Sequence, residues 1–168
     1  NILKHEGKEE GTNEELVVDM DGNGIIDQGD RSPDRYFAGS ALPTYTFAFF
    51  PSIRYKGFDL SMLWRGSGGN KIYNSIKTSF SYFENLGKSN LLKSAVETGL
   101  FTSKYGSDLW LEDGSFVRFD NLTLGYTFRP GSIKYIQSLR LSLTGNNLAV
   151  FTKYTGLDPE LNVSGGNG

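Results

Sequence analysis

The stretch from Trp110 to Phe128, WLEDGSFVRFDNLTLGYTF, constrains the fold of this chain more than any other part. Its second half alternates strictly: apolar side chains occupy the even positions from Leu122, and small or polar ones occupy the odd positions from Asn121. Successive side chains of a β-strand point to opposite faces, so the segment is predicted to form a strand with one apolar and one polar face. Such a strand suits either a soluble β-sandwich or a membrane barrel with a wet interior.

Three further segments alternate in the same way, at 44–55, 58–66 and 138–150. The pair Lys56-Gly57 is a tight-turn signal between the first two, and the segment 129–137 reverses the chain before the last. The sequence therefore predicts an all-β fold of antiparallel strands, in two hairpins at 44–66 and 116–150. Each run is close to the roughly 9–11 residues that a tilted strand needs to cross a bilayer.

Composition excludes several classes of function. Cysteine is absent, so neither a disulfide framework nor a thiolate metal site can form. The formal net charge of -2 gives no support for nucleic acid as a partner. The one histidine, His5, lies in the acidic and polar stretch 1–18, which we expect to be a flexible lead. Without cysteine or a second histidine the usual nucleophile-base pairs are missing, and we predict that the chain is not an enzyme.

The acidic segment 19–30, DMDGNGIIDQGD, has the spacing of a calcium loop. Calcium prefers six to eight hard oxygen ligands, and a calcium loop supplies them at alternating positions around a glycine that allows a sharp turn. Gly24 is at the turn position. The alternative is a turn-rich loop whose Asp and Asn side chains bond their own backbone. We favour Ca²⁺, with the candidate ligands Asp19, Asp21, Asn23, the carbonyl of Ile25, Asp27 and Asp30.

Charged residues share the polar positions of the predicted strands: Arg54, Asp59, Arg65 and Arg140. They form either a ladder that points into a wet lumen or the solvated face of a soluble sheet. Arg118 and Asp120 instead share parity with Leu122, so either they lie beyond the hydrocarbon band or a β-bulge shifts the register.

Aromatic residues fall into two groups. Those on the strands are predicted to form interfacial belts, or else to fill a soluble core: Tyr45, Trp64, Tyr126 and Phe128. Those in the long connections could stack on sugar rings or contact a partner, although ordinary loop packing is the simpler interpretation for each: Tyr73, Tyr82, Phe83, Trp110 and Tyr154. The connection 67–115 is also expected to contain a short helix, capped by Asn90 and ended by Gly99.

Four segments in order resemble the C-terminal portion of the SusC/RagA family of TonB-linked outer-membrane transporters. They are DMDGNGIIDQGDR at 19–31, YKGFDLSMLWRGSGGNKIYN at 55–74, WLEDGSFVRFDNLTLGYTF at 110–128 and SLRLSLTGNNLAVFTKYTGLDPE at 138–160. The resemblance implies a place in a transmembrane β-barrel of about 22 strands in the bacterial outer membrane. It also implies a SusD-like surface lipoprotein and TonB as partners, and import of oligosaccharide or peptide.

The chain departs from the family pattern, because we expect it to lack the plug domain, the TonB-contacting region and the last barrel strand. The resemblance then implies extracellular loops at 1–43, 67–115 and 151–168, the last leading toward the missing strand. The turns 56–57 and 129–137 would face the periplasm. The alternative function is a secreted, calcium-stabilised β-rich module that binds glycan or protein.

Overall fold

The computed structural model describes residues 1–131, 135 and 137–160, and its chain divides into two compact units. The sheet unit consists of Leu42–Asn70 and Gly114–Lys153. The loop unit consists of Asn1–Ala41, Lys71–Asp113 and the segment that begins at Tyr154. No helix within the described residues combines the length and the apolar character needed to cross a membrane.

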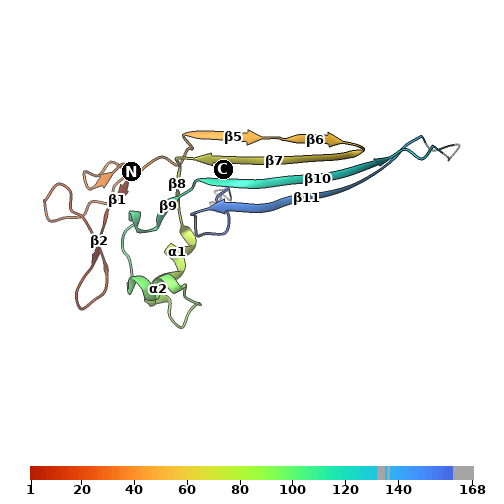
Figure 1. The fold of residues 1–168 in the computed structure, drawn as a ribbon. Coiled ribbons are helices and arrows are strands. Elements are labelled where there is room, and N and C mark those ends of the chain that lie inside the picture. The colour runs from red at the N-terminus through yellow and green to blue at the C-terminus, as the bar shows by residue number, and fades with distance from the viewer. Residues whose placement is uncertain (132–134, 136, 161–168) are drawn as a thin grey trace. The chain divides into compact units, whose positions relative to one another are not determined.

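Five antiparallel strands form the sheet unit, in the order β11-β10-β7-β5 with β6 also paired to β7 (Figure 1). Phe50, which breaks the alternation of the segment 44–55, lies between β5 and β6. Residues 132–134 and 136 of the predicted turn 129–137 lie outside the described residues. The strands are β5 (Tyr45–Phe49), β6 (Ser52–Tyr55), β7 (Phe58–Gly68), β10 (Phe116–Phe128) and β11 (Leu139–Thr152).

Strand register keeps like side chains together across the sheet. Leu124 of β10 lies opposite Leu60 of β7 and Leu143 of β11. The register shifts between Phe119 and Asn121, on both sides of β10. This irregularity is a β-bulge at Asp120. Because Arg118 pairs with Arg65 of β7, the Arg118 side chain lies on the polar face of the sheet.

Glycines in β7 allow aromatic rings from the neighbouring strand to lie against the backbone. A Cβ atom at Gly66 would lie 2.4 Å from the carbonyl oxygen of Phe116 and 2.7 Å from the ring of Phe47. At Gly68 it would lie 2.5 Å from the ring of Tyr45. The edge strand β5 is thus seated against β7 where β7 has no side chains.

The loop unit contains short elements. Its two-stranded pairings are β1 with β4, β2 with β3, and β8 with β9. Their bounds are β1 (Ile2–Leu3), β2 (His5–Lys8), β3 (Glu15–Val17), β4 (Arg35–Tyr36), β8 (Lys71–Tyr73) and β9 (Leu111–Asp113). Its helices are α1 (Ser75–Phe80), α2 (Lys93–Thr98) and the 3-10 turns η1 (Phe83–Asn85) and η2 (Asp108–Trp110).

The stretch 1–18, expected to be a flexible lead, is instead built into this unit. Leu3 is fully buried, and Glu15 of β3 is almost so. The Glu15 carboxylate lies 2.9 Å from Nδ1 of His5 and accepts a hydrogen bond from the Ser107 hydroxyl. The expectation was wrong because the partners of this stretch come from a distant part of the chain.

Three of the five loop aromatics pack inside the unit. Tyr82, Trp110 and Tyr154 are buried, and the Trp110 indole N–H donates to the Tyr82 hydroxyl over 2.8 Å. Burial raises the pKa of Tyr82 to about 12, so its hydroxyl stays protonated. Packing, rather than ligand contact, is the role that the structure gives these three rings.

Helix α2 ends where the sequence predicts and begins elsewhere. Gly99 adopts the left-handed conformation (φ 65°) that closes the helix. The residue at the N-cap is Leu92, not the expected Asn90, and it provides no side-chain cap. The other helix, α1, does have a side-chain cap: Asn74 accepts a hydrogen bond from the Lys77 N–H.

Glu112 of β9 joins three segments of the loop unit. Its carboxylate lies 2.9 Å from Nζ of Lys77, and it accepts hydrogen bonds from the Asn74 amide and from the backbone N–H of Thr155. Burial alone would raise the pKa of the Glu112 carboxyl. The hydrogen bonds from Thr155, Lys77 and Asn74 outweigh it and hold the pKa below its ordinary value.

The contact at Gly66 predicts that Gly66→Ala lowers the free energy of unfolding of the protein by about 1–3 kcal/mol, the usual cost of overpacking. Urea titration of the folded protein would measure this. Ser67→Ala, at the next position and on the opposite face, is the matched control. Equal stability of the two variants would contradict the packing described here.

The Glu112 cluster predicts a pH dependence. A carboxyl with a lowered pKa stabilises the fold above its ordinary value of 4.5, and this stabilisation is lost as the pH falls through the lowered pKa. Glu112→Gln should remove that pH-dependent part and cost about 1–3 kcal/mol at neutral pH, since the buried Asn74 amide and the half-buried Lys77 ammonium lose a charged acceptor.

Hydrogen exchange of the Lys77 and Thr155 amides in the intact parent protein, followed as a function of pH, measures the effect. Glu97→Gln is the control, because Glu97 belongs to an exposed pair with Lys93 on α2. Identical pH profiles for wild type and Glu112→Gln would refute the assignment.

Candidate functional site

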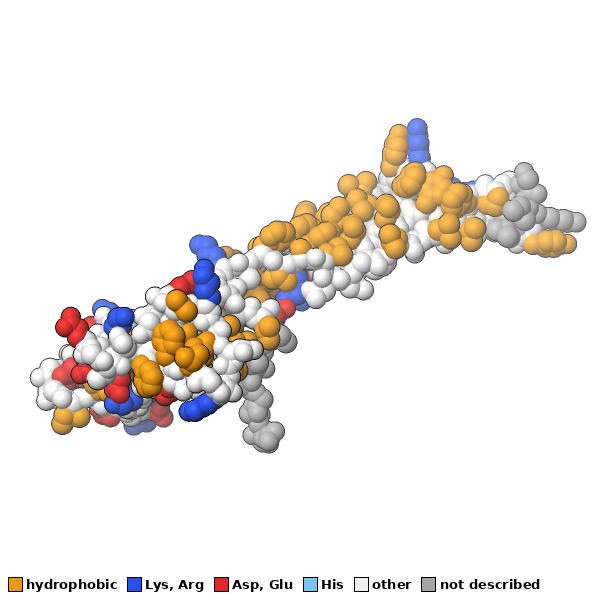
Figure 2. Space-filling model, turned by 90° about the horizontal axis from the view of Figure 1, so that it is seen from below, with side chains coloured by type: hydrophobic (Ala, Val, Ile, Leu, Met, Phe, Trp, Pro, Cys, Tyr) orange, Lys and Arg blue, Asp and Glu red, His pale blue; other side chains and the backbone are white. Residues whose placement is uncertain are grey.

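The apolar face of the sheet has an ordered pattern along its strands. An aliphatic band lies between two aromatic rows, and Figure 2 shows hydrophobic side chains gathered along the strands. One row contains Phe58, Tyr126 and Phe128, with ring centroids 4.4 Å apart in each neighbouring pair. In the other row Trp64 stacks on Phe119 at 4.3 Å. The band between the rows contains Ile53, Leu60, Met62, Leu122, Leu124 and Leu143, whereas Leu141 lies level with the first row, opposite Tyr126.

The band between the rows fits within the apolar belt of a bilayer. Trp64 and Phe58 are six residue steps apart on β7, about 20 Å along the strand, which corresponds to roughly 15 Å of height for a strand tilted by about 35–45°. Outer-membrane barrels carry an apolar band about 25 Å tall between aromatic girdles. Of the four residues predicted as belts, Trp64 lies in one row and Tyr126 and Phe128 in the other. Tyr45 lies beyond the Trp64 row, opposite Gly68.

These apolar side chains are not covered by the chain itself. Leu141 is 58% exposed and Leu143 is 76% exposed. A soluble sandwich would bury such residues in its core. The exposure therefore favours a face that meets lipid.

The opposite, polar face has charges at both ends and hydroxyl groups between them. Near the tight turn, Arg140 contacts Asp59 through two hydrogen bonds. At the far end, Nε of Arg65 donates to Asp120 over 2.6 Å. Between these pairs, the hydroxyl groups of Thr123 and Thr144 are 3.0 Å apart. All four predicted ladder residues thus lie on this face, Arg54 opposite Asp59.

The acidic loop folds through side-chain-to-backbone bonds. Asp19 accepts hydrogen bonds from the N–H groups of Gly22 and Gly24, over 2.8 and 2.7 Å. The amide oxygen of Asn23 accepts from the N–H of Ile25 over 2.7 Å. Gly24, at the expected turn position, has φ 81°. These are the Asx turns of the alternative interpretation, and they leave carboxylate lone pairs available for a cation.

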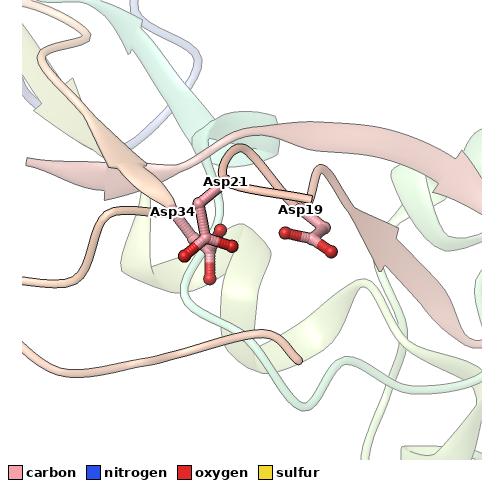
Figure 3. Close-up of side chains that lie close together, drawn as sticks. All are labelled: Asp19, Asp21 and Asp34. Atoms are coloured by element: carbon pink, nitrogen blue, oxygen red, sulfur yellow. The ribbon is translucent and has the colours of Figure 1, made fainter. Parts of the chain in front are cut away.

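Asp34 is the residue that the spacing argument missed. It is fully buried, and its carboxylate accepts from the N–H of Met20 over 2.9 Å and from the N–H of Asp27 over 2.8 Å. One carboxylate oxygen each of Asp19, Asp21 and Asp34 lie within 4.8 Å of one another (Figure 3). Hard oxygens this close together are the donor type that Ca²⁺ takes.

The structure does not bring the other two predicted carboxylates into this group. Asp27 uses its carboxylate to accept from the N–H of Gly29, and Asp30 is exposed. Within the described residues, the cluster of possible metal-binding carboxylates is Asp19, Asp21 and Asp34. Hydrogen bonds from the N–H groups of Gly24, the largest cause, and Gly22 hold the pKa of the Asp19 carboxyl below its usual range, against the opposing effect of burial.

Comparison with known sequences finds transport proteins. The chain is 31% identical over 168 residues to "TonB-dependent receptor P3" of Formosa agariphila, covering 91% of this chain and 16% of that protein. It is 36% identical over 159 residues to "TonB-dependent receptor SusC" of Bacteroides thetaiotaomicron, covering 88% of this chain and 15% of that protein. The chain therefore spans about a sixth of the length of these curated relatives. No protein-family model matches it.

Comparison with solved structures gives the same fold. The "RagAB peptide transporter" matches with a TM-score of 0.76 and 23% identity, over 94% of this chain and 19% of that one. The "closed-closed" state of the "RagAB peptide importer" matches with a TM-score of 0.72 and 25% identity, over 94% of this chain and 20% of that one. These relatives are receptors and transporters, not enzymes. With the two-faced antiparallel sheet, the likenesses show that the chain belongs to the SusC/RagA-type TonB-dependent transporters of the outer membrane, where it forms part of the β-barrel.

Proposed function

We propose that this chain forms a section of the wall of a TonB-dependent importer, with its apolar face toward lipid and its polar face toward a water-filled pore. The observation that carries the proposal is that the charged side chains of the paired strand residues keep to one face, on both sides of the bulge at Asp120. A charge that points into a wet lumen costs little, whereas on the lipid face it costs about 2–4 kcal/mol at the midplane.

The cargo and the partners follow from the relatives. Glycan or peptide is the proposed cargo of the whole protein, because the relatives include SusC and the solved structures a peptide transporter. A SusD-like lipoprotein on the outer surface and TonB on the periplasmic side are the proposed partners. The loop unit would then lie outside the cell and the Lys56-Gly57 turn in the periplasm.

The acidic loop is proposed to bind Ca²⁺. The support is the group formed by Asp19, Asp21 and Asp34, together with the calcium-type spacing of the segment 19–30. Backbone hydrogen bonds already shape the loop, and the lowered pKa of Asp19 keeps this carboxylate ionised for a cation. Asn23, Ile25, Asp27 and Asp30 remain the ligands that the spacing predicts.

The secreted module is the less favoured function. A soluble domain would have to cover the apolar face, and the described part of the chain leaves Leu124, Leu141 and Leu143 exposed. A calcium site in the loop unit is compatible with either function, so calcium binding does not decide between them.

The membrane orientation predicts opposite behaviour of neighbouring residues on β11. In the intact parent transporter, Ser142→Cys should react with a charged, water-soluble thiol reagent, because Ser142 lies opposite Gly125 on the polar face. Leu141→Cys should resist that reagent, and a fluorophore attached there should be quenched by lipids with brominated acyl chains. Leu143→Cys and Thr144→Cys form a matched second pair. Equal reactivity within both pairs would overturn the proposed wall.

The calcium proposal predicts which carboxylates matter. Asp21→Asn and Asp34→Asn should each weaken Ca²⁺ binding at least about tenfold, the lower end of the loss seen even for outer-shell partners. Calorimetric titration of the intact parent protein with Ca²⁺ measures this. Asp30→Asn is the matched control and separates the folded group from the ligand set predicted by spacing. An absence of binding heat with the wild-type protein at millimolar Ca²⁺, the weak end of extracellular sites, would remove the proposal.

A further inference from the structure

The polar face has a hollow at its tight-turn end, with a volume of about 460 Å³. Four strands or their ends contribute to it, and the polar residues that line it include Arg54, Asp59, Thr127, Arg129 and Arg140. Arg54 lies opposite Asp59, and Thr127 lies opposite Arg140, so these side chains belong to the polar face.

One arginine of the hollow is held in a fixed position. Nε and Nη2 of Arg140 donate to the two carboxylate oxygens of Asp59, over 3.1 and 2.5 Å, across the intervening strand β10. At the crossing point β10 has Gly125. A Cβ atom there would lie 2.6 Å from both carboxylate oxygens of Asp59 and 2.7 Å from Nη2 of Arg140. The glycine therefore makes room for the bidentate pair.

The remaining charges of the hollow are not balanced. Arg54, Lys56, Arg129 and Arg140 line it with one acid, Asp59, so four positive charges face one negative charge. Asp59 interacts electrostatically with Arg54 as well, but both of its oxygens are already engaged by Arg140. Within residues 1–131, 135 and 137–160, neither Arg54 nor Arg129 forms an ion pair with a carboxylate.

The chemistry of these groups selects the ligand. Planar guanidinium groups bind carboxylate or phosphate through paired hydrogen bonds. A lipid phosphate would approach from the apolar side, whereas Arg54, Asp59 and Arg140 of this hollow lie on the polar face. We propose that the hollow binds carboxylates of an acidic protein segment that enters from the pore. The inference rests on the proposed pore-facing orientation of the polar face.

Zero-length coupling in the intact parent transporter, in outer membranes, tests the proposal. Arg54→Lys and Arg129→Lys each place a primary amine in the hollow, and a carbodiimide joins an amine to a carboxylate only when the two are in direct contact. Peptide mass spectrometry then identifies the carboxylate. The native pair of Lys104 and Glu14, 2.5 Å apart, is the internal positive control. Thr144→Lys, from the hydroxyl row of the same face, is the matched control for non-specific coupling.

We expect the lysines introduced at positions 54 and 129 to be joined to an Asp or Glu that lies outside the sheet unit, and we expect no such product from Thr144→Lys. The site is refuted if Lys104 couples to Glu14 while both introduced lysines remain free, or couple only to Asp59. Equal coupling from position 144 also refutes it. The cysteine labelling of β11 distinguishes failure of this site from failure of the proposed function. If Ser142→Cys is accessible to water and coupling fails, the proposed pore wall is retained and only the carboxylate-binding site is refuted.

Discussion

The rest of the structure depends on strand pairing that never mixes the two faces of the sheet. Because side chains alternate with a period of two, a slip of one residue would move every apolar side chain of a strand to the polar side. Strand β10 carries such a break in its sequence pattern at Asp120. The bulge absorbs the extra residue, so that Arg118 and Thr123 share one face although their parities differ. Neighbouring β11 makes its own adjustment there, since its four residues from Asn146 to Ala149 match the three residues of β10 from Phe119 to Asn121. Asn147, with φ 50°, is the residue that turns, and its side chain accepts a hydrogen bond from Arg118.

Separated faces also explain where glycine is needed in the sheet. On the apolar face, Gly66 and Gly68 receive the rings of β5, which brings an edge strand and its aromatic side chains close to β7. On the polar face, Gly125 serves an ion pair, because the bond between Arg140 and Asp59 has to cross a whole strand. The same residue type therefore allows ring packing on one side and charge pairing on the other. In both cases the missing side chain is replaced by a side chain from a neighbouring strand.

The sequence predicts the sheet well because alternation is a local signal. The range predicted for the third strand, 116–128, agrees with β10, and even its irregularity could be read from the parity of Arg118. The loop unit was harder, because its core joins residues that are far apart in the chain. The buried Glu15 accepts hydrogen bonds from the hydroxyl groups of Ser107 and Tyr82, and no short window of sequence reveals these contacts. The stretch 1–18 has a polar sequence without a regular period. Its charged side chains contact residues that are far away in the chain, and sequence periodicity does not detect such contacts.

The acidic loop shows how such a distant contact changes the chemistry of a motif. Spacing alone selects Asp19 and Asp21, but it places the last ligand at Asp30 rather than at Asp34. Asp34 accepts hydrogen bonds from the N–H groups of Met20 and Asp27, so one buried carboxylate holds the two sides of the loop together. A cation at this point would find its oxygens already assembled. Its main effect would be to relieve the repulsion among three carboxylates rather than to fold the loop. Calcium bound there should therefore stiffen the loop unit while leaving the register of the sheet unchanged.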